Sequence, residues 1–141
     1  MQSWPHELAG VVAKINPANN NNSTQNSDSV DLSKFHAAMF ILLLGSVDST
    51  NDFKIQESAD ASSWSDLSGK AITQLAGTDD NKVAIISVRN DELSAGKRYV
   101  RCVNTVGNGT TNITSTVGLG FFPRYGPATD DDLAAVAQVI S

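Results

Sequence analysis

Short apolar segments separated by turn residues fill the middle of this 141-residue chain, and the longest apolar run has eight residues. In Asp52–Glu57, Phe53 and Ile55 alternate with polar residues, which is the pattern of a half-buried strand. Met39–Leu44 and Val83–Val88 are apolar on both faces, which favours strands in the middle of a sheet. The spacing therefore predicts an all-β domain.

Turn residues separate these segments at 46–51, 59–63, 77–81 and 90–96. Two further strands are predicted at Tyr99–Val106 and Asn112–Phe122, and the Asn-Gly pair between them predicts a hairpin. Shorter strands are expected near Val30–Leu32, Trp64–Leu67 and Ala71–Gln74. Strands of this length and spacing predict an antiparallel β-sandwich or jelly-roll-like barrel over residues 31–123.

The lead segment, residues 1–30, has a different composition. Leu8, Val11, Val12 and Ile15 have helical spacing, but the run is short and β-branched, so a strand fits as well. Asn19–Ser27 has no apolar residue and is expected to be disordered alone. We predict an extended N-terminal arm with an Asn-rich tether, in which these apolar residues and Trp4 anchor on a neighbouring chain. The alternative is that residues 8–15 belong to the same domain.

The tail, residues 124–141, is expected to contain a short C-terminal helix. Thr129 is a good N-cap, and Asp130–Asp132 would lie at the positive end of the helix dipole. Leu133, Val136 and Ile140 would then form one apolar stripe, which covers a sheet edge or docks on a partner. The candidate interface residues of the whole chain are therefore Trp4, Leu8, Val11, Val12, Ile15, Leu133, Val136 and Ile140.

Charge and hydropathy argue against two kinds of partner. The chain has 15 Asp and Glu against 10 Lys and Arg, with no basic block, which argues against nucleic acid because phosphate binding needs clustered cations. A membrane helix needs about 20 apolar residues, so no membrane partner is expected.

Met1–Pro5 lacks the basic and apolar regions of a signal peptide. The protein is expected to be made in a cytoplasm and to leave it only within a particle.

Residues with reactive side chains form no recognisable site. The single Cys102 excludes an internal disulfide and is expected to be a small buried side chain. His6 and His36 are thirty residues apart, and Asp130–Asp132 does not match a calcium loop. A Gly-x-Ser-x-Gly nucleophile motif is also missing. We therefore expect no enzyme activity, no catalytic residues, no cofactor and no metal site.

Several segments together resemble a family of virion structural proteins of tailed bacteriophages, over roughly residues 30–140. They are Asp31–Phe35, Ile55–Asp60, Ser63–Leu75, Asp79–Lys82, Val88–Arg101 and Phe122–Ala128. The resemblance implies a head decoration or cement subunit at the capsid surface, with the major capsid protein and copies of itself as partners. It brings no catalytic residues.

Three functions remain open from the sequence. The first is a cement protein that bridges neighbouring capsid subunits, and the second is a neck, tail or fibre-associated virion protein. The third is a carbohydrate-binding module in which Trp64 and Tyr125 stack on sugars. Low charge, the apolar tail and exposed strand edges also favour self-association as a dimer or trimer.

Overall fold

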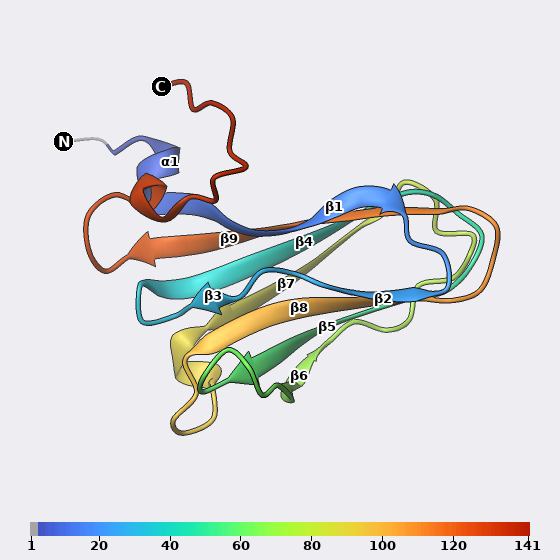
Figure 1. Cartoon of the computed structure of the whole chain (residues 1–141), viewed down its shortest axis with the longest axis horizontal. Helices are drawn as coiled ribbons and strands as arrows, with labels where there is room; N and C mark the ends of the chain where they lie inside the picture. The colour runs from blue at the N-terminus through green and yellow to red at the C-terminus, as the bar shows by residue number, and fades with distance from the viewer. Residues whose placement is uncertain (1–2) are drawn as a thin grey trace.

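Two antiparallel sheets face each other in the computed structural model, which describes residues 3–141 (Figure 1). The regular elements are α1 (Pro5–Leu8), β1 (Ala9–Asn19), β2 (Ser23–Asn26), β3 (Val30–Asp31), β4 (Phe35–Val47), β5 (Asn51–Ser58), β6 (Ser65–Ala71), β7 (Val83–Arg89), β8 (Tyr99–Val106) and β9 (Asn112–Pro123). Two 3-10 turns complete them, η1 (Asn90–Glu92) and η2 (Ala128–Asp131). The predicted all-β antiparallel sandwich is confirmed.

The strand order is that of a jelly roll. One sheet has the order β1-β9-β4-β7, and the other has β2-β8-β5-β6. The short strand β3 also pairs with β8, so β2 and β3 act as one interrupted strand. Most connections, including β4 to β5 and β8 to β9, cross from one sheet to the other. Apart from the consecutive pair β5 and β6, the strands thus pair with partners distant in sequence, as in double-sheet jelly rolls.

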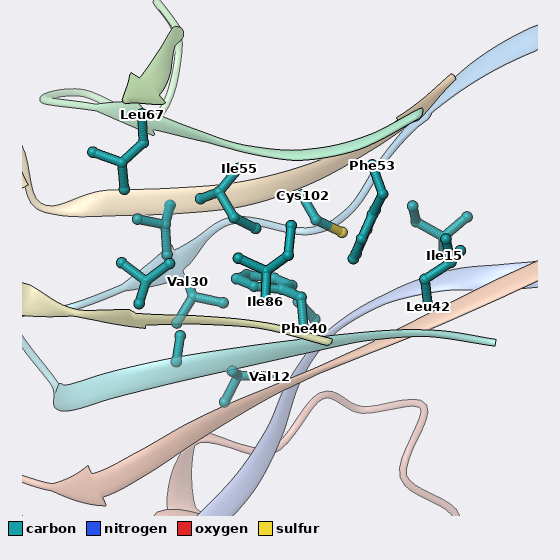
Figure 2. Packing of buried hydrophobic residues seen from close by; sticks show 14 of the residues in the cluster. Val12, Ile15, Val30, Phe40, Leu42, Phe53, Ile55, Leu67, Ile86 and Cys102 are labelled. Carbon is teal, nitrogen blue, oxygen red and sulfur yellow. The ribbon is translucent and has the colours of Figure 1, made fainter. Parts of the chain in front are cut away.

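The core lies between the sheets and is built from alternate residues of each long strand (Figure 2). Phe35, Phe40 and Phe53 are its largest fully buried side chains. Gly118 and Gly120 of β9 make room for two of these rings, because a Cβ there would lie 2.8 Å from Phe40 Cε1 and 2.7 Å from Phe35 Cδ2 respectively. Glycine in this strand therefore serves close packing.

The lead segment belongs to the domain, which corrects the expectation of an arm. β1 pairs with β9 along the edge of the four-stranded sheet. Val12 and Ile15 are buried in the common core. β-branched side chains with alternating burial suit a pleated strand. The alternative stated above, that this segment is part of the same domain, is therefore the correct one for residues 9–19.

The Asn-rich stretch is also ordered, contrary to the expectation of a disordered tether. We call Asn19, Asn20, Asn21, Asn112 and Asp48 the asparagine hub, since their side chains bond to one another or to the same loops. Asn112 is fully buried, and its Nδ2 donates to Asn21 Oδ1 at 2.9 Å. Asn20 Nδ2 donates to Thr114 Oγ1 at 2.7 Å. Hydrogen bonds within the hub and to the neighbouring strand, rather than apolar packing, hold these amide side chains in place.

Two strand predictions are also corrected. β8 and β9 do not form a hairpin, because the connection at 107–111 passes between the sheets. The Asn-Gly signal describes only the turn, whereas the apolar faces of both strands turn toward one core. β7 is an edge strand rather than a central one. Beyond β6, residues 72–74 are irregular, and Leu75 makes only an isolated bridge with Asn51.

The C-terminal helix consists of the single turn η2, and the predicted stripe beyond it is not helical. Asp132 Oδ1 accepts a hydrogen bond from Val11 N at 2.8 Å, and Leu133 N donates to Val11 O at 2.8 Å. Groups that would continue a helix are therefore bonded to the edge of β1. Helix propensity is overridden by this tertiary pairing. None of the helices within residues 3–141 has the length and hydropathy needed to span a membrane.

Candidate functional site

Three of the segments that carry the phage resemblance come together at one end of the sandwich. Strand register shows this, because Ser58 pairs with Tyr99, Ala37 with Arg89 and Phe35 with Pro123. Around a groove of about 340 Å³ at this end lie residues from the β3–β4 turn, from η1 and the loop that joins it to β8, and from the segment after β9. We call it the end groove, and its lining is Leu32, Ser33, Asn90, Leu93, Lys97, Arg98, Arg124 and Tyr125.

Arg98 is held in place at the wall of the end groove. Its Nε and Nη2 donate to the two carboxylate oxygens of Asp31, at 3.1 and 2.6 Å, and its guanidinium lies 4.7 Å from the Tyr99 ring centre. Partial burial is the largest single influence and acts to raise the pKa of Asp31, but the hydrogen bonds from Arg98 and Ser33 and the charge of Arg98 together outweigh it, so the pKa is lowered. The carboxylate stays charged and fixes the cation.

Lys97 and Arg124 give the end groove its uncompensated positive charge. Neither forms an ion pair within residues 3–141. Tyr125, beside them, is 76% exposed. An aromatic ring next to unpaired cations suits an anionic or acidic partner segment, although the protein as a whole carries net charge −5.

Trp64 and Tyr125 do not form a shared sugar platform. Trp64 does not line the end groove. The Arg101 guanidinium lies 4.5 Å from its ring centre, and Arg101 Nε and Nη2 donate to Gln56 Oε1 at 3.0 and 2.8 Å. One face of the Trp64 ring is therefore covered by a tethered cation.

The predicted interface residues fall into three groups. Val12 and Ile15 are buried in the core, so they cannot contact a partner. Val11 is half-buried and binds the tail through its backbone. The remaining five lie in α1, at its N-cap or in the tail.

Those five residues belong to what we call the terminal surface, formed by residues 4–8 and 132–141. A groove of about 460 Å³ lies there between His6 of α1 and Leu133, Val136 and Val139 of the tail. Trp4 is 56% exposed and Ile140 78% exposed. The two predicted ends of the interface are thus brought together, although without the predicted helix.

The outer face of the four-stranded sheet is a surface that the sequence did not reveal. Leu43 pairs with Val83, and Ile41 with Ile85, in neighbouring strands. Leu43, Val83 and Ile85 are each more than half exposed, at 51%, 54% and 56%. We call these four residues the outer apolar patch. The unbroken apolar run Val83–Ile86 was the available signal, because at an edge strand it puts apolar side chains in solvent.

Residues with reactive side chains are dispersed or buried. Cys102 is buried as predicted, and its burial raises the pKa of the thiol to about 12. Within residues 3–141 there is no group of three His, Cys, Asp or Glu side chains that could hold a metal ion. Asp131 and Asp132 instead bond to Lys34 and Val11.

Comparison with known proteins gives likenesses of fold. No family model and no curated protein matches the chain. Similar solved structures include a CBM4 chain, 14% identical, with 72% of this chain and 61% of that chain covered and a TM-score of 0.42. The match thus spans less than two thirds of that CBM4 chain.

Two others cover most of both chains. A protein of Bacillus endospore appendages, described as disulfide-linked pili, is 9% identical over 86% of this chain and 96% of that chain, with a TM-score of 0.47. The SPBc2 prophage-derived protein YomS is 10% identical over 79% and 89%, with a TM-score of 0.43. Likenesses of this degree say nothing about what the present chain does.

Proposed function

We propose that this protein is a non-enzymatic structural component of a phage particle, and that it decorates the capsid by bridging neighbouring capsid subunits. The observation that carries the proposal is the end groove. Three segments that resemble phage virion proteins, distant from one another in the chain, converge there around Lys97, Arg98 and Arg124. Jelly rolls serve in capsids and in lectins alike, so the proposal rests on this site and not on the fold.

The end groove is the proposed contact with the major capsid protein. Its unpaired cations, Lys97 and Arg124, favour an acidic segment of that protein, and the exposed Tyr125 ring adds apolar contact area. Exposed aromatic and arginine side chains are the residues that most often dominate binding at protein interfaces.

Rebinding to particles tests the proposal. Particles of the phage that encodes this chain are stripped of the protein and incubated with recombinant protein. The double variant Lys97→Glu, Arg124→Glu is expected to bind at least tenfold more weakly, and Tyr125→Ala is expected to bind more weakly too. Lys14→Glu is the matched control, because Lys14 also lacks an ion pair within residues 3–141 and lies on β1.

Copy number separates the decoration role from a neck, tail or fibre role. Hundreds of copies per particle support the head, whereas a few to a dozen place the protein in the neck or tail. Absence of the protein from purified particles contradicts both.

A further inference from the structure

β7 is one of the two edge strands of the four-stranded sheet. One hydrogen bond shows which of its residues turn their backbone groups toward β4. Leu44 N donates to Lys82 O at 2.9 Å, and Leu42 pairs with Ala84 and Phe40 with Ile86. Since hydrogen-bonded pairs alternate in an antiparallel ladder, the even-numbered residues of β7 bond to β4. Val83, Ile85, Ser87 and Arg89 therefore turn their backbone groups away from the sheet.

In two of these four residues, Ser87 and Arg89, one outward-facing backbone group already forms a hydrogen bond within the chain. Ser87 O accepts a hydrogen bond from Lys70 Nζ at 2.9 Å, and Arg89 N donates to Glu92 Oε2 at 2.8 Å. Val83 and Ile85 have no such partner within residues 3–141. Their side chains are also more than half exposed. A two-residue stretch of open edge thus coincides with the outer apolar patch.

The opposite edge of the same sheet is protected, which makes the open stretch specific to β7. On β1, both backbone groups of Val11 are bonded to Asp132 and Leu133, and Lys14 N donates to Asp28 Oδ2 at 3.1 Å. Folded proteins usually block such edges because an open one pairs with another strand. Here the chain closes one edge with its own tail and leaves the other available.

We propose that β7 pairs antiparallel with β7 of a second copy, with Val83 of each copy opposite Ile85 of the other. This register uses both open residues in both copies, and a two-fold axis passes beside Ala84. It sets two β-branched side chains opposite each other on either side of the axis. The two four-stranded sheets then form one continuous sheet, and the outer apolar patches of the two copies join.

A second copy fits this edge for two reasons. Val83–Ser87 carries no charged side chain, so the strand does not repel itself. The two open residues of one copy also match the two open residues of the other, so the same edge supplies both sides of the pairing. The pairing is argued from the β7 edge itself. It rests on the proposed function only where it is taken as the self-association surface of a decoration protein.

Sedimentation velocity of the isolated protein between about 1 and 100 µM tests the pairing, because this range covers the dissociation constants of dimers with micromolar affinity. The wild type is expected to form dimers, and Ile85→Lys to remain monomeric with an unchanged melting temperature, because a charged lysine blocks an edge strand. Ile140→Lys is the matched control, since Ile140 is exposed but lies in the tail. A monomeric wild type, or a dimer that persists in Ile85→Lys, overturns the pairing.

A disulfide tests the register. Ala84→Cys in both copies is expected to cross-link under mild oxidation, because the two residues lie directly opposite across the axis. Ser87→Cys is expected not to cross-link, since its opposite position is residue 81. The reverse result overturns the register. A cross-linked dimer that does not bind particles leaves the pairing standing and removes only the decoration role.

Discussion

Asn112 Nδ2 donates a hydrogen bond to Asp48 Oδ1 across 3.0 Å, although the two residues are 64 positions apart in the chain. Asn112 Oδ1 in turn accepts from the backbone of Asp48 and Ser49 at 3.2 and 3.0 Å. This one buried amide therefore ties the β4–β5 connection to the start of β9. Through Asn21 it reaches the β1–β2 turn as well.

Removing this amide is expected to destabilise the fold. Asn112→Ala removes four side-chain hydrogen bonds of a fully buried residue, and we expect the free energy of unfolding to fall by about 3 kcal/mol. Urea unfolding followed by circular dichroism measures the change. Asn108→Ala, at an exposed position of the same connection, is the control and is expected to stay within about 0.5 kcal/mol of the wild type. Equal stability of both variants would show that the asparagine hub contributes little.

Acid is expected to weaken the same hub. Backbone hydrogen bonds from Thr110 and Thr111, with one from the Asn112 side chain, lower the pKa of Asp48 below its ordinary value. The unfolded chain then takes up a proton at higher pH than the native protein does. The contribution to stability is therefore full above the unfolded pKa and is lost as the pH falls through the lowered one. The free energy of unfolding, measured from pH 6 to about pH 2, should fall less with decreasing pH in Asp48→Asn than in the wild type.

Packing at Gly120 is expected to tolerate no side chain. A Cβ there would lie 2.7 Å from the buried ring of Phe35, and overpacking of this kind costs about 1–3 kcal/mol. Thermal unfolding of Gly120→Ala measures the loss. The double variant Gly120→Ala, Phe35→Leu should recover part of the loss relative to Phe35→Leu alone. Additive effects of the two changes would contradict the contact.

Deleting residues 3–19 is expected to prevent folding, because it removes β1 and the buried side chains of Val12 and Ile15. Burying each of these contributes about 1.5–3 kcal/mol. The matched control is removal of 134–141, which lie beyond the contacts of Asp132 and Leu133 with β1. The control should retain a cooperative melting transition. A folded 3–19 deletion would restore the hypothesis of a separate arm.

Cys102 is expected to be unreactive in the native protein. Its thiol is fully buried, and its raised pKa of about 12 keeps it protonated near neutral pH. An aromatic disulfide reagent should react with less than one tenth of the chains at pH 7.5 and with all of them in guanidinium chloride. Rapid reaction of the native protein would indicate opening between β2 and β8.

Patterns of two or three residues were enough to predict the strands but not their partners. The alternation around Phe53 and the apolar run at Met39–Leu44 reflect burial on one or both faces of a strand, so β5 and β4 could be predicted. The same rule misplaced β7, because an edge strand that exposes Val83 and Ile85 looks like a central strand in sequence.

The asparagine hub and the tail could not be predicted for a related reason. Asn19–Asn22 lacks apolar residues, and only the distant Asn112 and Asp48 give its amides partners. The tail has good helix signals, but Val11 competes for its backbone and for Asp132. Of the candidate site, sequence indicated the segments that line the end groove and the two ends of the terminal surface. It did not indicate the outer apolar patch.

The bonds between β1 and the tail also bear on how the chain could be reconnected. α1 and the segment after η2 lie at the same end of the sandwich (Figure 1). A short linker could join the two ends of the chain, and new termini could be opened in the exposed loop at 59–63. Such a circular permutant would keep every strand pair and carry a fused cargo on the opposite flank of the molecule, away from the tail.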